Sequence, residues 1–320
     1  MTAHAKSISR VVFHADDFGM NAAVNRGILV SFRRGLLTST SLLANAPHAE
    51  EACREWRTLV VEQASERLES QVARREFDEP QLPFDLGIHL NLSQGKPLTG
   101  DRYPAEMLDA NGNFPGIGTA FYRMNRIRAA TLRFVEEELN AQIEWMCDRG
   151  FRPHHLNGHQ YVELIPQVAV RIPDLLRRYA IPVVRVARES ELARNVLLKG
   201  RVATWGIGLV KRYYATKLRH RVQESEFGHP DRFFGTCHAG QVTIRTLSRF
   251  LNQATRTGCT EIGLHPGDDP LGNEISESDA WFDPLHGLRK TEEEWLCGPE
   301  LRSLLAKRNL KLGRLQALGH

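Results

Sequence analysis

The sequence predicts an α/β protein, folded as a closed or nearly closed (β/α) TIM-like barrel of six or seven βα units, with a doubly wound sheet as the alternative. Two observations predict this class. Short apolar runs of strand length alternate with stretches in which apolar residues recur at helical spacing. No segment repeats at a period of about 20 to 50 residues, and no linker interrupts the chain, so we expect a single domain over 1–320.

The N-terminal part of the chain supplies the first three expected strands. Consecutive apolar residues indicate a strand over 11–15, which leads into a helix over 22–34 with Gly35 at its C-terminal cap. The next expected elements are a strand over 36–45, a charged helix over 49–73 and a strand over 86–92.

A long irregular segment follows at 94–129, rich in Gly, Pro and Asn. We expect a lid loop there, because loops of this length are usually functional. The clearest helix lies at 131–149, where apolar residues share one face and Gly150 ends the run. The remaining expected elements are a strand end over 154–157, helices over 166–179, 209–222, 243–257 and 299–308, and strands over 181–187, 261–265 and 311–315.

Composition and charge exclude several classes of protein. The 42% hydrophobic and 25% charged content is typical of a globular domain, and no apolar run approaches the roughly 20 residues of a transmembrane helix. The start lacks the apolar stretch of a signal peptide. The five cysteines are odd in number and form no Cys-x-x-Cys pair, which argues against disulfides and thiolate metal sites. We therefore expect a cytoplasmic protein.

Basic residues gather between 185 and 221, within a segment at 188–231 that we interpret as a basic insertion. Such a face can meet an anionic substrate or a membrane surface, although most charge runs are simply solvated. The net charge of only +4 and the lack of a recognised nucleic-acid module argue against a nucleic-acid partner.

Asp16 and Asp17 are adjacent carboxylates in the turn between the first strand and the first helix. The turn after a strand is where α/β proteins bind ligands. Neighbouring carboxylates repel unless a divalent cation or a shared proton relieves the repulsion. Helix capping is the structural alternative for an aspartate at this position.

Three further polar groups follow apolar strands in the same way. They are His89, the run from His154 to Gln160, and His265. In a barrel these strand ends converge on one mouth, where one carboxylate and two imidazoles complete a ligand set for a divalent ion. Such an ion supports metal-assisted hydrolysis. A structural role remains the alternative for each histidine, and the role of His238, in a loop near the mouth, stays open.

Five segments match, in order, the motifs of one known family. They are x-A-D-D-F-G at 14–19, G-x-H-L-x-L at 87–92, H-L-x-x-H-Q-x-V-x-L-I-P at 155–166, P-D-x-F-F-G-x-x-x-x-G at 230–240 and x-x-H-P-G at 263–267. Each motif alone is modest, but five in register are specific. The chain resembles the YdjC/ChbG carbohydrate deacetylases, and some members of that family act on glycosylated hopanoid lipids.

The resemblance implies a distorted (β/α) TIM-like barrel that removes an N-acetyl group from an amino sugar with one divalent ion, Mg²⁺ or Zn²⁺. Carried over residue by residue, it makes Asp17, His89 and His159 the metal ligands. It makes Asp16 the general base toward the attacking water and His265 the acid that protonates the leaving amine. One carboxylate would then neutralise the ion while its neighbour keeps its proton affinity.

The chain departs from the family pattern H-x-D-S-H-x-H-V-H over 155–163. Asn157 replaces the aspartate and Gly158 the serine, while Tyr161 and Glu163 replace histidines. Loss of the aspartate removes a carboxylate support for a histidine ligand, although Asn157 can still accept a hydrogen bond. The other changes indicate a different substrate rim. The basic stretch, with Trp205, Leu209, Tyr213 and Tyr214, suits a glycolipid-linked substrate as an alternative to a chito-oligosaccharide-like one.

Two other functions fit the same residues. One is metal-dependent hydrolysis of a phosphoester or glycosidic bond, and the other is non-catalytic carbohydrate binding on the same fold. The expected partner is an N-acetylated sugar, with peripheral contact to a lipid substrate and a homodimer left open.

Overall fold

The computed structural model describes residues 9–74, 82–189, 202–254, 258–271 and 281–318. Its strands form one parallel sheet in the order β5-β4-β3-β2-β1-β7-β6, with the short β8 also paired to β1. The strands are β1 Ser9–Phe18, β2 Ser39–Leu42, β3 Asp85–Leu90, β4 His155–Gly158, β5 Val183–Val184, β6 Arg232–Phe234, β7 Gly258–Leu264 and β8 Lys311–Leu312.

The sheet curls until its two outer strands approach each other. Two isolated parallel bridges connect these edges of the sheet: Val183 of β5 pairs with Gly228 ahead of β6, and Glu189 beyond β5 pairs with Phe233 of β6. The fold is therefore the predicted distorted (β/α) TIM-like barrel, with two single bridges where a regular barrel has a full strand pair.

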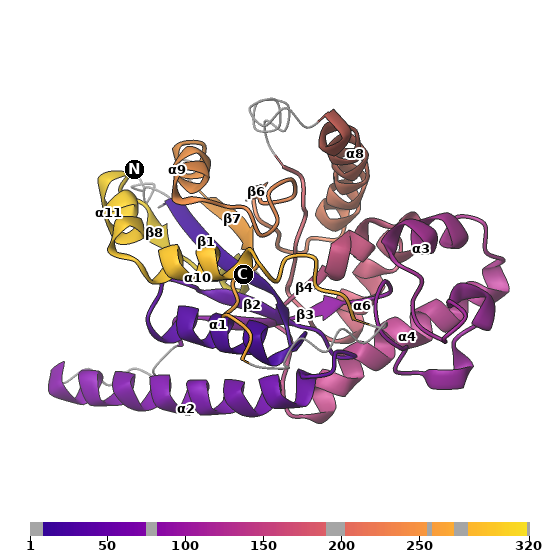
Figure 1. Cartoon of the computed structure of the whole chain (residues 1–320), viewed down its shortest axis with the longest axis horizontal. Coiled ribbons are helices and arrows are strands. Elements are labelled where there is room, and N and C mark those ends of the chain that lie inside the picture. The colour runs from indigo at the N-terminus through magenta and orange to yellow at the C-terminus, as the bar shows by residue number, and fades with distance from the viewer. Residues whose placement is uncertain (1–8, 75–81, 190–201, 255–257, 272–280, 319–320) are drawn as a thin grey trace, which may run out of the picture.

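Helices surround the sheet, with α1 and the long α2 along one side and α3 and α4 together at one end of the molecule (Figure 1). The α-helices are α1 Ala22–Arg33, α2 Ala49–Arg74, α3 Ile117–Met124, α4 Ala129–Asp148, α5 Pro166–Ala169, α6 Ile172–Arg178, α8 Val202–Glu224, α9 Ile244–Asn252, α10 Arg289–Cys297 and α11 Pro299–Lys307. The 3-10 turns are η1 Gly100–Arg102, η2 Ala105–Met107, η3 His159–Leu164 and η4 Gln316–Leu318. Within the described ranges, no helix combines the length and apolar character needed to cross a bilayer.

The central strand β1 positions the first two candidate residues. Val11, Phe13 and Ala15 are fully buried. All residues of β1 from Ser9 to Ala15 pair with β7 in an unbroken register. The register with β2 shifts between Ala15 and Phe18, where the strand is irregular. Asp16 and Asp17 lie in this irregularity, so their side chains are displayed at the carboxyl end of the sheet.

Several expected elements differ from the structure. The segment expected as an irregular loop at 94–129 contains two 3-10 turns and α3. The helix expected over 166–179 is split into α5 and α6, because Pro173 lacks the N–H that would continue the first helix. The strand β6 and the helix α10 were not expected, since one is three residues long and the other has few apolar residues.

Part of the expected basic insertion, 190–201, lies outside the described residues. The rest of that segment is dominated by α8, which begins seven residues before the helix expected over 209–222. Most of the described part of 188–231 therefore forms one long helix, α8.

The packing of α1 against the loop after β7 allows no side chain at Gly27. A Cβ atom there would lie 2.3 Å from the Cα atom of Gly267. We expect Gly27→Ala to lower the free energy of unfolding by about 1–3 kcal/mol, although alanine favours helices. The matched control is Gly206→Ala in α8, where a Cβ would meet nothing within 4 Å, and a gain of up to about 1 kcal/mol is expected. Urea unfolding measures both, and a fully stable Gly27 variant would contradict this close packing.

Candidate metal centre and active site

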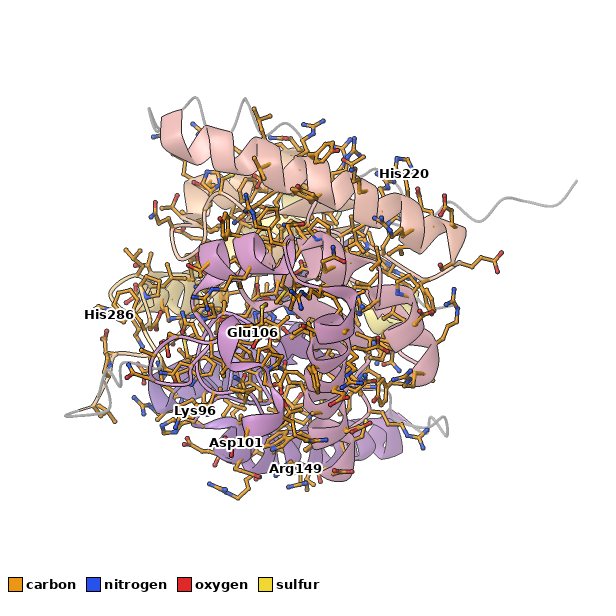
Figure 2. The ribbon with its side chains drawn as sticks, turned by 90° about the vertical axis from the view of Figure 1, so that its right-hand side faces the viewer. Lys96, Asp101, Glu106, Arg149, His220 and His286 are labelled. Carbon is orange, nitrogen blue, oxygen red and sulfur yellow. The ribbon has the colours of Figure 1, made fainter. Side chains whose placement is uncertain are left out.

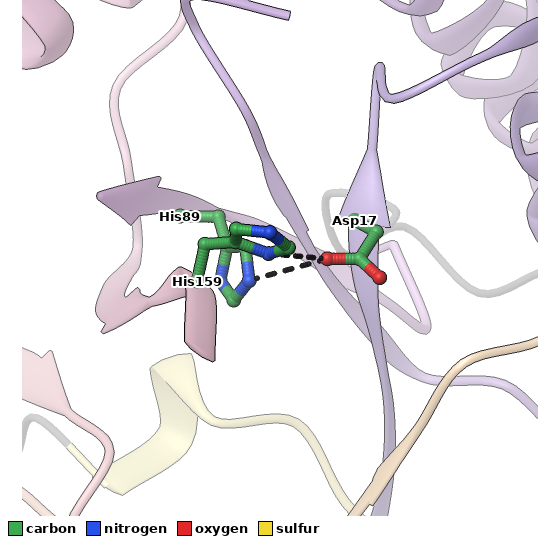
Figure 3. Close-up of side chains that lie close together, drawn as sticks. All are labelled: Asp17, His89 and His159. Atoms are coloured by element: carbon green, nitrogen blue, oxygen red, sulfur yellow. Dashed lines mark hydrogen bonds and ion pairs between the residues drawn. The ribbon is translucent and has the colours of Figure 1, made fainter. Parts of the chain in front are cut away.

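Asp17, His89 and His159 meet at the carboxyl ends of β1, β3 and β4 (Figure 3). Asp17 Oδ1 lies 2.9 Å from His159 Nδ1 and 3.6 Å from His89 Nε2. One ligand atom from each residue lies within 4.8 Å of the other two, and all three side chains are buried. The structure thus brings together the three residues that the resemblance implied as ligands.

The donor set fits a divalent cation. Bonds of about 2.0 to 2.2 Å to imidazole nitrogen and carboxylate oxygen place neighbouring ligand atoms roughly 3 to 3.5 Å apart, and the two observed separations bracket that range. Asn157 Oδ1 lies 2.8 Å from His89 Nδ1, so a neutral His89 ring that donates to this oxygen would turn the lone pair of its Nε2 toward Asp17 and a bound cation. Two imidazole nitrogens and one carboxylate oxygen could therefore hold Zn²⁺, Mn²⁺ or Mg²⁺.

The backbone around these ligands is strained. Asp17 has a φ of 71°, and the two residues after His159, Gln160 and Tyr161, have φ of 50° and 66°. Residues other than glycine rarely adopt this left-handed region, and such outliers cluster at functional sites. The left-handed backbone lies at Asp17 itself and directly after His159, next to two of the three side chains that converge.

The second oxygen of Asp17 is held by an arginine from the C-terminal part of the chain. Arg289 Nη2 donates to Asp17 Oδ2 over 2.8 Å, while Arg289 Nε donates to Asp283 over 2.7 Å. Burial alone would raise the pKa of Asp17, but His159 and Arg289 outweigh it and hold that pKa well below its usual range. Asp17 is thus a carboxylate at neutral pH, as a metal ligand must be.

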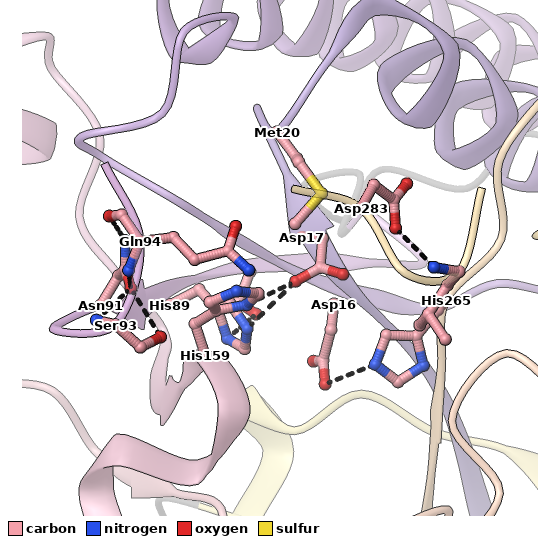
Figure 4. Close-up of polar contacts among 12 residues, drawn as sticks. Asp16, Asp17, Met20, His89, Asn91, Ser93, Gln94, His159, His265 and Asp283 are labelled. Atoms are coloured by element: carbon pink, nitrogen blue, oxygen red, sulfur yellow. Dashed lines mark hydrogen bonds and ion pairs between the residues drawn. The ribbon is translucent and has the colours of Figure 1, made fainter. Parts of the chain in front are cut away.

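The carboxylate of Asp16 lies on the side of the site nearest His265, next to the triad (Figure 4). Arg185 Nη1 donates to its Oδ2 over 2.8 Å, and Asn157 Nδ2 donates to its Oδ1 over 3.0 Å. Burial favours the neutral acid, yet Arg185 and His89 keep the pKa of Asp16 well below its usual range. Asp16 is therefore an ionised, hydrogen-bonded carboxylate beside the triad and not part of it.

His265 follows the last residue of β7 and faces Asp16. Its Nε2 lies 3.8 Å from Asp16 Oδ2, and its Nδ1 is buried without a hydrogen-bond partner among the described residues. The backbone N–H of His265 donates to Glu292 over 2.6 Å, which fixes the strand end. Burial lowers the pKa of the imidazole, so the ring is neutral at neutral pH.

These groups lie at one end of a cavity of about 870 Å³. Its other walls come from α3, η3, α8 and the segment before α10, and they are largely apolar. They include Ile117, Phe121, Leu164, Val210, Tyr214 and Leu285. Lys211 lies in the same wall, with its Nζ 4.1 Å from the ring centroid of Tyr161. The cavity combines a polar reaction centre with an apolar approach.

Two arginines of the site were not expected from the sequence. Arg185 directly follows β5, which is the strand-end position that singled out the histidines, so the same signal could have found it. Arg289 begins α10, a helix without a clear apolar face, and no sequence signal indicated its place.

The remaining histidines with open roles lie apart from the triad. The His155 ring lies 4.9 Å from that of His14, between centroids, in the buried interior of the sheet. His238 packs against Phe250 at 5.4 Å between centroids. Neither lines the cavity, which is consistent with structural roles.

A family model described as YdjC-like protein matches residues 10–307 of the chain. A carbohydrate deacetylase of Mus musculus is 32% identical over 321 residues, covering 95% of this chain and 93% of the relative. A carbohydrate deacetylase of Geobacillus stearothermophilus is 34% identical over 183 residues, but the match spans only 62% of that relative and 57% of this chain. A chitooligosaccharide deacetylase of Proteus mirabilis is 25% identical over 96% of this chain and 98% of its own length.

Among solved structures, one from Enterococcus faecalis V583 has a TM-score of 0.70 to this chain. The match covers 98% of this chain and 99% of the other at 21% sequence identity. That protein is described as one proposed to cleave cellobiose phosphate. At this level of identity the likeness concerns the fold alone.

Proposed function

The chain belongs to the YdjC-like protein family, and from that premise we propose that it is a cation-dependent deacetylase of an N-acetylated amino sugar. The observation that carries the proposal is the arrangement of Asp17, His89 and His159 beside a separate carboxylate, Asp16, at the end of a ligand-sized cavity. The names of the relatives support the same bond type.

Each polar group of the site has a task in amide hydrolysis. A divalent cation held by Asp17, His89 and His159 would polarise the acetyl carbonyl and lower the pKa of a nearby water. Asp16 accepts the proton of the attacking water, and Arg185 keeps this carboxylate oriented. His265 starts neutral and has no proton to spare for the departing nitrogen. Asp16 passes His265 the proton taken from the attacking water, across the 3.8 Å between Asp16 Oδ2 and His265 Nε2, and His265 then gives a proton to the nitrogen.

The apolar walls favour a substrate with an apolar part, as in a glycolipid-linked amino sugar. On α8, Val210 faces the cavity and is also 54% exposed, and Tyr213 nearby is 56% exposed. On the facing helix α3, Tyr122 is 57% exposed. Apolar surface that continues from a cavity to the outside of a protein can bind an apolar group attached to the sugar, such as the lipid part of a glycolipid. We assign α3, with the rest of 94–129, the role of a lid over this approach.

Cation content and acetate release together test the proposed function. We expect protein loaded with Zn²⁺, Mn²⁺ or Mg²⁺ to release acetate from N-acetylated sugars, and chelation with EDTA to stop the release. Bound cation without acetate would favour hydrolysis of another bond, and neither cation nor turnover would favour a carbohydrate-binding protein. A comparison of soluble with lipid-linked N-acetyl sugars tests the substrate class, and equal kcat/KM for both would refute the glycolipid preference.

A further inference from the structure

Among the side chains that the structure describes, Asn157 alone hydrogen-bonds both to a residue of the triad and to Asp16. It lies in β4 directly opposite His89 of β3 in the sheet register, and its side chain is fully buried. Its Oδ1 is 2.8 Å from His89 Nδ1, and its Nδ2 is 3.0 Å from Asp16 Oδ1. The amide therefore spans the gap between the two functional halves of the site.

The chemistry of the two neighbours determines how this amide is oriented. His89 presents Nε2 to Asp17, so a neutral ring that offers its lone pair there carries its proton on Nδ1. The atom of Asn157 that meets Nδ1 must then be the acceptor oxygen. The remaining atom is the NH₂ group, which is the donor that an ionised Asp16 requires.

Other side chains at position 157 would not supply both the acceptor for His89 Nδ1 and the donor for Asp16 Oδ1. An aspartate would still accept from His89 but would set a second carboxylate oxygen against Asp16 Oδ1. A leucine of similar size would serve neither neighbour. Among the described residues, His89 Nδ1 would keep only its longer contact to Ser41 Oγ, at 3.2 Å, and Asp16 Oδ1 only its contact to His14 Nε2, at 3.2 Å. An amide of this length is the side chain that serves both.

We propose that Asn157 is a positioning residue with two separable tasks, which rest on the proposed function. Its carbonyl fixes the tautomer and the ring of His89 for cation binding. Its amide NH₂ holds Asp16 Oδ1, while Arg185 holds Oδ2, so that the carboxylate is kept off the cation and aimed at the attacking water.

The variants Asn157→Asp and Asn157→Leu separate the two tasks. Cation affinity is measured by calorimetry without substrate, and kcat and KM are measured at saturating cation. Asn157→Asp should keep cation affinity within about threefold and lose about 10²-fold in kcat with little change in KM, because misplaced catalytic groups cost that much. Asn157→Leu should lose about 10 to 100-fold in cation affinity as well.

Two results would overturn the proposal. One is an aspartate variant with the kcat of the unmodified protein, and the other is an aspartate variant that loses as much cation affinity as the leucine variant. The ring ¹⁵N shifts of His89 give a readout independent of turnover, since only the leucine variant should lose the single Nδ1–H tautomer. If Asn157→Leu does not fold, Asn157→Ala removes the same two hydrogen bonds and carries the same expectations.

Failure of the proposed function is distinguishable from failure of this inference. If the unmodified protein releases no acetate, the proposed function fails, and the cation affinities and the His89 spectrum still decide the first task of Asn157. If acetate is released and the variants behave alike, only the inference fails.

Discussion

Replacing Asp16 with asparagine should stop acetate release while cation binding stays intact. The change keeps the size of the side chain and removes its proton affinity, so the loss in kcat should be about 10² to 10⁴-fold, the usual contribution of a general base. Asp17, His89 and His159 are untouched, because Asp16 contacts Arg185 and Asn157 instead. Acetate release and calorimetric titration with Zn²⁺ or Mn²⁺ measure the two effects.

The control for Asp16→Asn is Asp268→Asn. Asp268 is a half-buried carboxylate that pairs with Arg26 and Lys290 outside the cavity lining, so its loss should leave turnover and cation affinity unchanged. Arg185 keeps Glu261 as an ion-pair partner in the Asp16 variant, which should preserve the fold. Equal loss of the cation and of turnover in Asp16→Asn would show that Asp16 is itself a ligand.

The second large effect is expected from His159→Ala, which removes one of the three donor atoms. Cation affinity should fall by at least about 10² and turnover with it, because two donors remain where the site uses three. The matched control is His220→Ala, a histidine on the outer side of α8 (Figure 2). Metal content after dialysis and acetate release check both variants. An alanine variant that retains a stoichiometric cation would remove His159 from the ligand set.

The strand-end positions predicted from the sequence which polar side chains would gather at one edge of the sheet, and the family resemblance selected three of them as the ligand set. Asp17, His89 and His159 each end or follow a short apolar strand, and parallel strands bring such positions to one edge of the sheet. Arg289 could not be predicted in this way. It belongs to a charged helix far along the chain, and only the packing of α10 near β1 places its guanidinium on Asp17.

The fold shows the same division between local pattern and tertiary contact. The strong period of α1 and α4 predicted both helices to within two residues at each end. The three residues of β6 form a strand only because β7 pairs with them, so their own pattern carries no signal. The double role of Asn157 likewise depends on His89 lying opposite it in the sheet, which no spacing in the sequence reveals.

The left-handed residues beside His159 set a limit on engineering this protein for heat resistance. Gln160 and Tyr161 each hold a conformation that costs a non-glycine residue about 1 kcal/mol or more. A glycine there would relieve that cost and would also free the turn that aims His159. Selection for melting temperature alone would therefore favour changes that disturb the placement of His159, so screens should score stability and cation binding together.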